Sequence, residues 1–230
     1  MRTKTYLFIL VMASFVCFSS CSKDDDQEID TKVTVTPTKV SMYYEETFQL
    51  SGTNVTKWES KDDFVAKVDS KGLVTGSHVG STQIIASNSR NSSSIEVTII
   101  PKYDLYDTPI LEWGASMATI QSKETHTKKN TSSTSAMLVY DYSKNSNSCL
   151  LAYYFTNGKL SRIDIYMDLM LYVSIGNYLL ERYSPLSVEN DLTMFADGYT
   201  KDKMTTIIGL QTKKVSGTQL TYVSYISSNQ

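Results

Sequence analysis

Residues 65–76 read VAKVDSKGLVTG, and this stretch decides the fold of the first half of the chain. Valine-rich runs stand on both sides of the sequence Asp69-Ser70-Lys71-Gly72, which has the composition of a turn. Short runs rich in β-branched residues, bounded by Asp, Ser and Gly, are typical of strands joined by a tight turn. The stretch therefore predicts two short strands.

The same pattern continues in both directions. Apolar and polar residues alternate within 33–36, 40–44 and 95–99, and turn residues such as those at 51–54 separate the runs. Short strands with turn signals about every 8 to 12 residues are the pattern of an antiparallel β-sandwich. We therefore expect an all-β domain over residues 32–100, without a helix of useful length.

Several residues of this region resemble, in their order and spacing, the bacterial Ig-like domain, group 2. These residues are Trp58-Glu59-Ser60, Val65-Ala66, Val68-Asp69, the segment 72–76, Gly80 and Ile84. The resemblance implies a spacer or adhesive module without catalytic residues, which holds the C-terminal part away from the membrane. It also implies that Trp58 fills the centre of the core. The family's usual glycine before the second core strand is replaced here by Glu45-Glu46-Thr47.

The N-terminus has the composition of a secretion signal. Arg2 and Lys4 precede the mostly apolar run 6–18 (YLFILVMASFVCF), which is too short to span a membrane. The segment 18–21 (FSSC) resembles the lipobox of bacterial lipoproteins, with Phe18 in place of the usual leucine. The resemblance implies a lipoprotein signal peptide over 1–20 and a palmitate-type membrane anchor on Cys21. The alternative is an ordinary cleavage site beside a chance thiol.

Residues 21–31 are expected to form an acidic tether. The run 22–31 (SKDDDQEIDT) is rich in acids and has no apolar periodicity. Residues 23–26 (KDDD) also resemble an export signal that sends some outer-membrane lipoproteins to the cell exterior, the alternative being a merely soluble linker. The expected localisation is the outer membrane, lipid-anchored and exposed at the cell surface. The leader holds two basic residues and no acid, so its removal changes the net charge from -2 to -4.

The composition argues against several function classes. With 22 basic and 24 acidic residues, the chain has no basic surplus for binding nucleic acid. The 2 His and 3 Cys are too few for zinc clusters, His-rich metal sites or a disulfide scaffold. No phosphate-binding or dinucleotide-binding motif and no protease or hydrolase signature occurs. We therefore expect no metal, no cofactor and no nucleic-acid partner. His78, in the loop between Gly76 and Gly80, is expected to be solvated.

A second domain is predicted over residues 101–230. It holds 13 of the 16 tyrosines, and helical periodicity first appears here. One short helix is predicted from the Ser116 cap to about Glu124, and an amphipathic helix over 168–183. Gly176 within the second helix is unfavourable for a helix, which predicts tight packing on a sheet.

Strands are predicted at 137–142, 150–155, 160–167, 192–196, 205–211 and 219–226. Asn157-Gly158 is the strongest hairpin signal, and Ser216-Gly217 supplies the last turn. The order predicts an α+β domain, an antiparallel sheet with two helices on one face. The sequences LEWG (111–114) and YLLERY (178–183) resemble C-terminal domains that follow such Ig-like modules in uncharacterised surface lipoproteins.

Groups suited to catalysis are scarce in this domain. Cys149 could act as a nucleophile with His126 as its base only if the fold brought the two side chains together. A cysteine more commonly fills a small buried space in the core. Asp164 and Asp168 lie near each other on one strand, as paired carboxylates for glycoside hydrolysis would, but acids are common on the wet face of a strand. We therefore expect that the protein is not an enzyme.

Tyrosines recur along the predicted strands, at positions 140, 142, 154, 166, 222 and 225. An exposed tyrosine-rich face would offer contact area to sugar rings or proteins, whereas half-buried cross-strand packing is the alternative. The candidate binding residues are Trp113, Tyr142 and Tyr166.

Together these features predict a cell-surface lipoprotein whose Ig-like module presents a C-terminal interaction domain to glycan or protein ligands. Two alternatives stay open. One is an extracellular hydrolase or accessory enzyme acting on a polymer through Asp164 and Asp168, and the other is a structural component of an envelope assembly.

Overall fold

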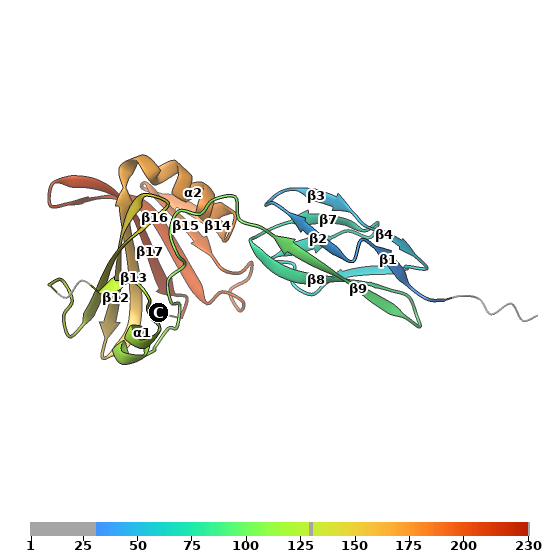
Figure 1. The fold of residues 1–230 in the computed structure, drawn as a ribbon, viewed down its shortest axis with the longest axis horizontal. Coiled ribbons are helices and arrows are strands. Elements are labelled where there is room, and N and C mark those ends of the chain that lie inside the picture. Colours follow the sequence, from blue (N-terminus) through green and yellow to red (C-terminus); the bar gives the residue numbers. More distant parts are fainter. Residues whose placement is uncertain (1–30, 129–130, 230) are drawn as a thin grey trace, which may run out of the picture. The chain divides into compact units, whose positions relative to one another are not determined.

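The computed structural model describes residues 31–128 and 131–229 (Figure 1). The predicted signal peptide (1–20), Cys21 and all of the predicted tether except Thr31 lie outside the described residues. Within the described ranges, no helix has the length and apolar character needed to cross a membrane.

The first domain is a β-sandwich of short strands. One sheet has the order β2-β9-β8-β5, the other has the order β3-β7-β6, and β1 pairs with β4. The pairing of β2 with β9 is parallel, and the other strand pairs of this domain are antiparallel. The strands are β1 (Thr34–Thr36), β2 (Lys39–Met42), β3 (Thr47–Gln49), β4 (Ser51–Thr53), β5 (Lys57–Ser60), β6 (Ala66–Val68), β7 (Leu73–Gly76), β8 (Gly80–Ser87) and β9 (Ser92–Ile99).

Trp58 packs against the sandwich core, but it does not fill the centre as expected. The fully buried centre comes from the aliphatic residues Val74, Ile84, Ala86, Ile95 and Val97. The indole is half-buried and lies over Gly72, where an added methyl group would stand 2.9 Å from Cε2 of the ring. Gly72 has φ +83, so both its backbone and the neighbouring ring favour glycine.

Two loop residues of this domain are notable. Glu45, in the turn where the family usually has glycine, takes φ 64 and donates its N–H to the Gly76 carbonyl at 2.8 Å. The prediction that His78 is solvated is wrong, because its ring is stacked on Phe64 at 3.9 Å and the residue is only 4 % exposed. Burial lowers the pKa of His78 below its ordinary value.

The second domain is built on an antiparallel sheet, which in the described residues has eight strands in the order β10-β11-β12-β13-β17-β16-β15-β14 (Figure 1). The helices are α1 (Met117–Lys123) and α2 (Tyr172–Leu180), the latter preceded by the 3-10 turn η1 (Leu169–Leu171). The strands are β10 (Thr127–Lys128), β11 (Met137–Lys144), β12 (Asn147–Thr156), β13 (Lys159–Asp168), β14 (Ser184–Glu189), β15 (Leu192–Ala196), β16 (Thr206–Val215) and β17 (Thr218–Ser227).

Tight turns join the long strands. Asn157 and Gly158 have φ 52 and 74, and Ser216 and Gly217 have φ 48 and 87, which confirms both predicted hairpins. Positive φ at two successive residues matches the twist of the flanking strands. The pairs 145–146 and 190–191 adopt the same conformation without a glycine.

Both α-helices pack on one face of this sheet, which we call the covered face. Ile120 of α1 and Ile175 and Tyr178 of α2 join a core with residues of the central strands, among them Ile163 and Tyr225. The predicted α+β fold, with its antiparallel sheet and two helices, is confirmed.

Two details of the domain differ from the prediction. The strand β14 was not predicted, because Pro185 favours the end of a helix; it lies at the sheet edge, where a proline is tolerated. The tight packing predicted at Gly176 is also wrong, since a methyl group there would stand 3.7 Å from Leu210 Cδ2, an ordinary contact distance.

Candidate binding face

The sheet face opposite the covered face carries aligned tyrosines. The strand register places Leu150, Tyr166 and Tyr222 side by side across β12, β13 and β17. Tyr154, Arg162 and Ile226 form a parallel row four residues away along the strands. Residues in register, or two apart along a strand, share a face. We call this surface the open face.

The row between these two consists mainly of small side chains. It runs from Ala152 through Asp164 and Ser224 to Gly209. On either side of this row, Tyr154 and Tyr166 are half-exposed, and Tyr222, next to Tyr166, is 6 % exposed. The tyrosine rings therefore rise on both sides of the row of small side chains, which we call the floor.

Asp164 lies at the centre of this floor and is 0 % exposed. Its Oδ1 accepts hydrogen bonds from Tyr222 Oη at 2.9 Å and Ser224 Oγ at 3.0 Å, and Arg162 Nε lies 3.2 Å away. Tyr166 Oη donates a longer bond of 3.5 Å to the other carboxylate oxygen. A buried carboxylate needs such partners, and the contacts fix the ring of Tyr222 and the guanidinium of Arg162.

Two cations lie against the tyrosine rings. The Arg162 guanidinium is 4.1 Å from the centre of the Tyr154 ring, and Lys213 Nζ is 4.5 Å from that of Tyr222 and 5.9 Å from that of Tyr166. Cations are attracted to the negative face of an aromatic ring. Burial, with the Asp164 carboxylate adding to it, raises the pKa of Tyr222 to about 12. The hydroxyl therefore stays protonated and continues to donate to Asp164.

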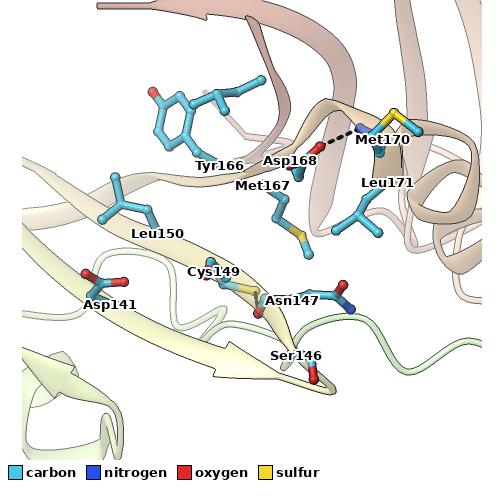
Figure 2. Close-up of a pocket in the computed structure, with 12 residues that line it drawn as sticks. Asp141, Ser146, Asn147, Cys149, Leu150, Tyr166, Met167, Asp168, Met170 and Leu171 are labelled. Carbon is cyan, nitrogen blue, oxygen red and sulfur yellow. Dashed lines mark hydrogen bonds between the residues drawn. The ribbon is translucent and has the colours of Figure 1, made fainter. Parts of the chain in front are cut away.

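A hollow of about 680 Å³ opens at one end of the open face, and we call it the end hollow. The pairing of β12 with β13 starts at Leu150 and Tyr166, so the strand ends beyond this pair leave a gap. Figure 2 shows Leu150 and Asp141 on one side and Met170 on the other, with the bond from Met170 N–H to Asp168 Oδ1 (2.8 Å) dashed. Met170 projects beside the hollow and is 88 % exposed.

The structure places only one of the three predicted binding residues on the open face. Tyr166 lies between the end hollow and the floor, as expected of a binding residue. Tyr142 lies on the covered face, where its ring stacks on His126 at 3.8 Å and its Oη accepts a bond from the Asp107 N–H. Trp113 packs half-buried against the core, and its Nε1 donates to Thr206 Oγ1 at 3.1 Å. The prediction of an outward orientation is therefore wrong for Tyr142, whereas Trp113 is half-buried away from the open face.

Cys149 and His126 do not form a reactive pair in this arrangement. The thiol is buried and directs its weak hydrogen bonds to the carbonyls of Asn147 and Leu105. Burial raises the pKa of the Cys149 thiol to about 11, so the thiolate that would act as nucleophile is not populated at neutral pH.

His126 belongs to a network of charges at the border of the covered face. Its Nε2 lies 3.1 Å from Asp107 Oδ2 and its Nδ1 lies 2.6 Å from Glu124 Oε1. Lys144 Nζ pairs with Asp107 at 2.5 Å and Asp104 at 2.6 Å. Across the described residues, no group of His, Cys, Asp and Glu has an arrangement suited to a metal ion.

The carboxylates of Asp164 and Asp168 have separate tasks. Asp164 is enclosed by its partners, and Asp168 caps the turn η1. Four residues of extended strand separate their backbones by roughly 13 Å, beyond the roughly 5 to 9.5 Å between the carboxyl groups of glycoside hydrolases. The pair does not match that geometry.

Sequence reasoning missed the cations of the open face. Arg162 and Lys213 lie on the wet side of predicted or extended strands, where a charged residue is common and draws no notice. Arg162 reaches the ring of Tyr154 across the hairpin of β12 and β13, and Lys213 reaches the ring of Tyr222 across the hairpin of β16 and β17, so both contacts depend on hairpin register.

Comparison with known proteins identifies the first domain. The family model of the bacterial Ig-like domain (group 2) matches residues 30–99, so this part of the chain is a domain of that family. No curated protein matches the chain.

Solved structures offer only a distant likeness. Domains 5-6 of the S-layer protein SbsC have 12% sequence identity and a TM-score of 0.26, over 86% of this chain and 85% of that one. A structure of domains 4-9 of the surface layer protein SbsC has the same identity and TM-score, over 86% of this chain and 27% of that one. This likeness is too slight to support a conclusion about fold or function.

Proposed function

We propose that this chain is a non-enzymatic lipoprotein of the bacterial cell surface, whose Ig-like domain presents a carbohydrate-binding C-terminal domain. The open face is the observation that carries the proposal. The network around the buried Asp164 fixes the tyrosine rings, which suit the C–H faces of sugar rings, and the exposed parts of Arg162 and Lys213 suit sugar hydroxyls.

The N-terminal sequence and the domain family support the proposed anchoring at the surface. The lipobox-like 18–21 and the acidic 22–31 support a lipid anchor on Cys21 in the outer membrane, followed by a spacer. A group 2 Ig-like domain at 30–99 supports the role of an extracellular module.

A sugar is a better fit than a protein partner because charges occupy the middle of the open face. Asp164, Arg162 and Lys213 lie among the rings. Protein–protein interfaces, in contrast, are depleted of charged residues at their centre. Saccharides accept and donate hydrogen bonds to such groups across their whole surface.

The test is a polysaccharide and glycan array probed with the full chain, together with the double variant Tyr154→Ala/Tyr166→Ala. The matched control is Tyr43→Ala, which removes a tyrosine of the Ig-like domain that is 41% exposed. We expect binding to at least one glycan, its loss in the double variant and its retention in the control. Binding to no glycan, or an unchanged double variant, contradicts the proposal, and capture of a host protein alone would favour the protein ligand instead.

A further inference from the structure

We infer that the ligand of the open face is an acidic polysaccharide, whose negative groups pair with Lys213 and Arg162 while its rings lie on the tyrosines. This inference rests on the proposed function and specifies its substrate class. It starts from the contrast between an acidic chain, with net charge -2, and the centre of this face.

The charges of the open face are arranged unequally. The carboxylate of Asp164 is fully enclosed by its partners, whereas the Arg162 side chain is 45% exposed and Lys213 is exposed. The exposed Asp141 stands in the row of Tyr166, with Leu150 between them. The exposed Asp168 stands in the row of Lys213, with Leu220 between them. A ligand that lies over the floor therefore meets the two cations at the rings, and it meets exposed carboxylates only toward the end hollow.

The spacing of the cations favours a polymer over a small anion. Lys213 Nζ is 4.5 Å from the centre of the Tyr222 ring, the hydroxyl of that ring is 2.9 Å from Asp164 Oδ1, and Arg162 Nε is 3.2 Å from the same oxygen. These contacts keep the two charged groups within roughly 13 Å of each other, the length of two or three sugar units. Between the two cations lie the rings of Tyr222 and Tyr166.

Lys213 can also change partner at low cost. Its ammonium is held on this face by the rings alone among the contacts described, and a ring attracts a cation less strongly than a carboxylate does in a charge-assisted bond. A carboxylate of the ligand would draw the ammonium away and expose the ring of Tyr222 for stacking. Lys213 would thus both bind the negative group of the ligand and make the ring of Tyr222 accessible.

The experiment compares pairs of polymers that differ only in charge. Polygalacturonate, alginate and hyaluronan are each offered to the full chain beside their carboxyl-reduced forms. We expect at least one acidic polymer to bind, roughly tenfold or more better than its reduced form, with affinity falling as salt rises. Equal binding of the two forms, or binding of neutral glycans only, overturns this inference and leaves the proposed function standing. No binding to any glycan overturns both.

Variants of one residue then locate the effect. Lys213→Gln should lower affinity for the acidic polymer about tenfold, and Lys213→Arg should restore most of it. Lys214→Gln is the matched control, because this exposed lysine is next in sequence and points away from the open face. Equal losses in Lys213→Gln and Lys214→Gln would show a general charge effect and contradict the assignment.

Discussion

On the covered face of the C-terminal sheet, Tyr153 and Tyr225 are fully buried, whereas Tyr154 and Tyr166 on the open face are half-exposed. The neighbours Tyr153 and Tyr154 differ only by the alternation of a strand. Tyr225 shares a hydrogen bond of 2.7 Å with the hydroxyl of Tyr106, inside the core. Tyrosines on the open face are instead gathered around a buried carboxylate and two cations.

This difference shows that one residue type can form both the buried core and an accessible surface of the same sheet. On the covered face the hydroxyl must find a partner within the core, because water is excluded. On the open face the network around Asp164 holds the rings in place but leaves part of their surface accessible. Composition alone therefore does not reveal which tyrosines are accessible.

The largest expected effect separates the two faces by stability. Tyr225→Ala removes a fully buried ring and should cost about 3–5 kcal/mol of unfolding free energy, whereas Tyr166→Ala should cost about 1 kcal/mol. Urea unfolding followed by circular dichroism measures both. Similar losses in the two variants would show that the open face is part of the core.

Alkaline pH should weaken the covered face through its buried thiol. Burial raises the pKa of Cys149 from its ordinary 9.0 to about 11. The unfolded thiol therefore ionises first. The stability that the protonated thiol contributes is complete below pH 9 and is lost as pH rises toward 11, by about 3 kcal/mol at most. Urea midpoints from pH 8 to 11 should fall less steeply in Cys149→Ala than in the unmodified chain. Parallel curves would contradict a buried, protonated thiol.

Removal of a tyrosine hydroxyl should also cost more unfolding free energy on the covered face than on the open face. Tyr106→Phe removes the hydrogen bond of 2.7 Å between the buried hydroxyls of Tyr106 and Tyr225 and should cost about 1–2 kcal/mol. Tyr166→Phe removes a half-exposed hydroxyl with one long bond to Asp164, so the loss should stay below about 0.5 kcal/mol. Thermal unfolding of both variants checks the order, and the reverse order would exclude the pairing of Tyr106 with Tyr225.

The smallest effect concerns one glycine beside each face. Gly176→Ala in α2 should stabilise the protein by about 0.5–1 kcal/mol, because helix propensity rises and the methyl group finds room near Leu210. Gly209→Ala in the floor should gain less, since a methyl group there would stand 3.0 Å from Leu192 Cδ1. An equal gain at both sites in urea unfolding would mean that the floor is not closely packed.

Local sequence signals were sufficient for much of the fold. The Ig-like sandwich, the turns at Asn157-Gly158 and Ser216-Gly217, and the helix α1 all depend on residues close in sequence. The strand β14 was missed because its place at the sheet edge, which accommodates Pro185, is a property of the whole sheet.

The candidate site could be predicted only in part. Tyr166 alternates with the apolar Ile165 and Met167, which indicates its outward direction. In β11 both faces are mixed, because Tyr140 and Tyr142 alternate with Val139 and Asp141, so the covered side could not be chosen from sequence. The cluster around Asp164 joins residues about 60 positions apart and depends on strand register.

The most direct test of the account is hydroxyl-radical footprinting of the full chain with and without the acidic polysaccharide that binds it. The account predicts that modification of Tyr154 and Tyr166 falls when the polymer is added, while Tyr43 of the Ig-like domain is modified equally in both samples. It also predicts that Tyr106, Tyr153 and Tyr225 stay unmodified throughout, because they are buried. Protection outside the open face, with Tyr154 and Tyr166 unchanged, would contradict the assignment of binding to this surface.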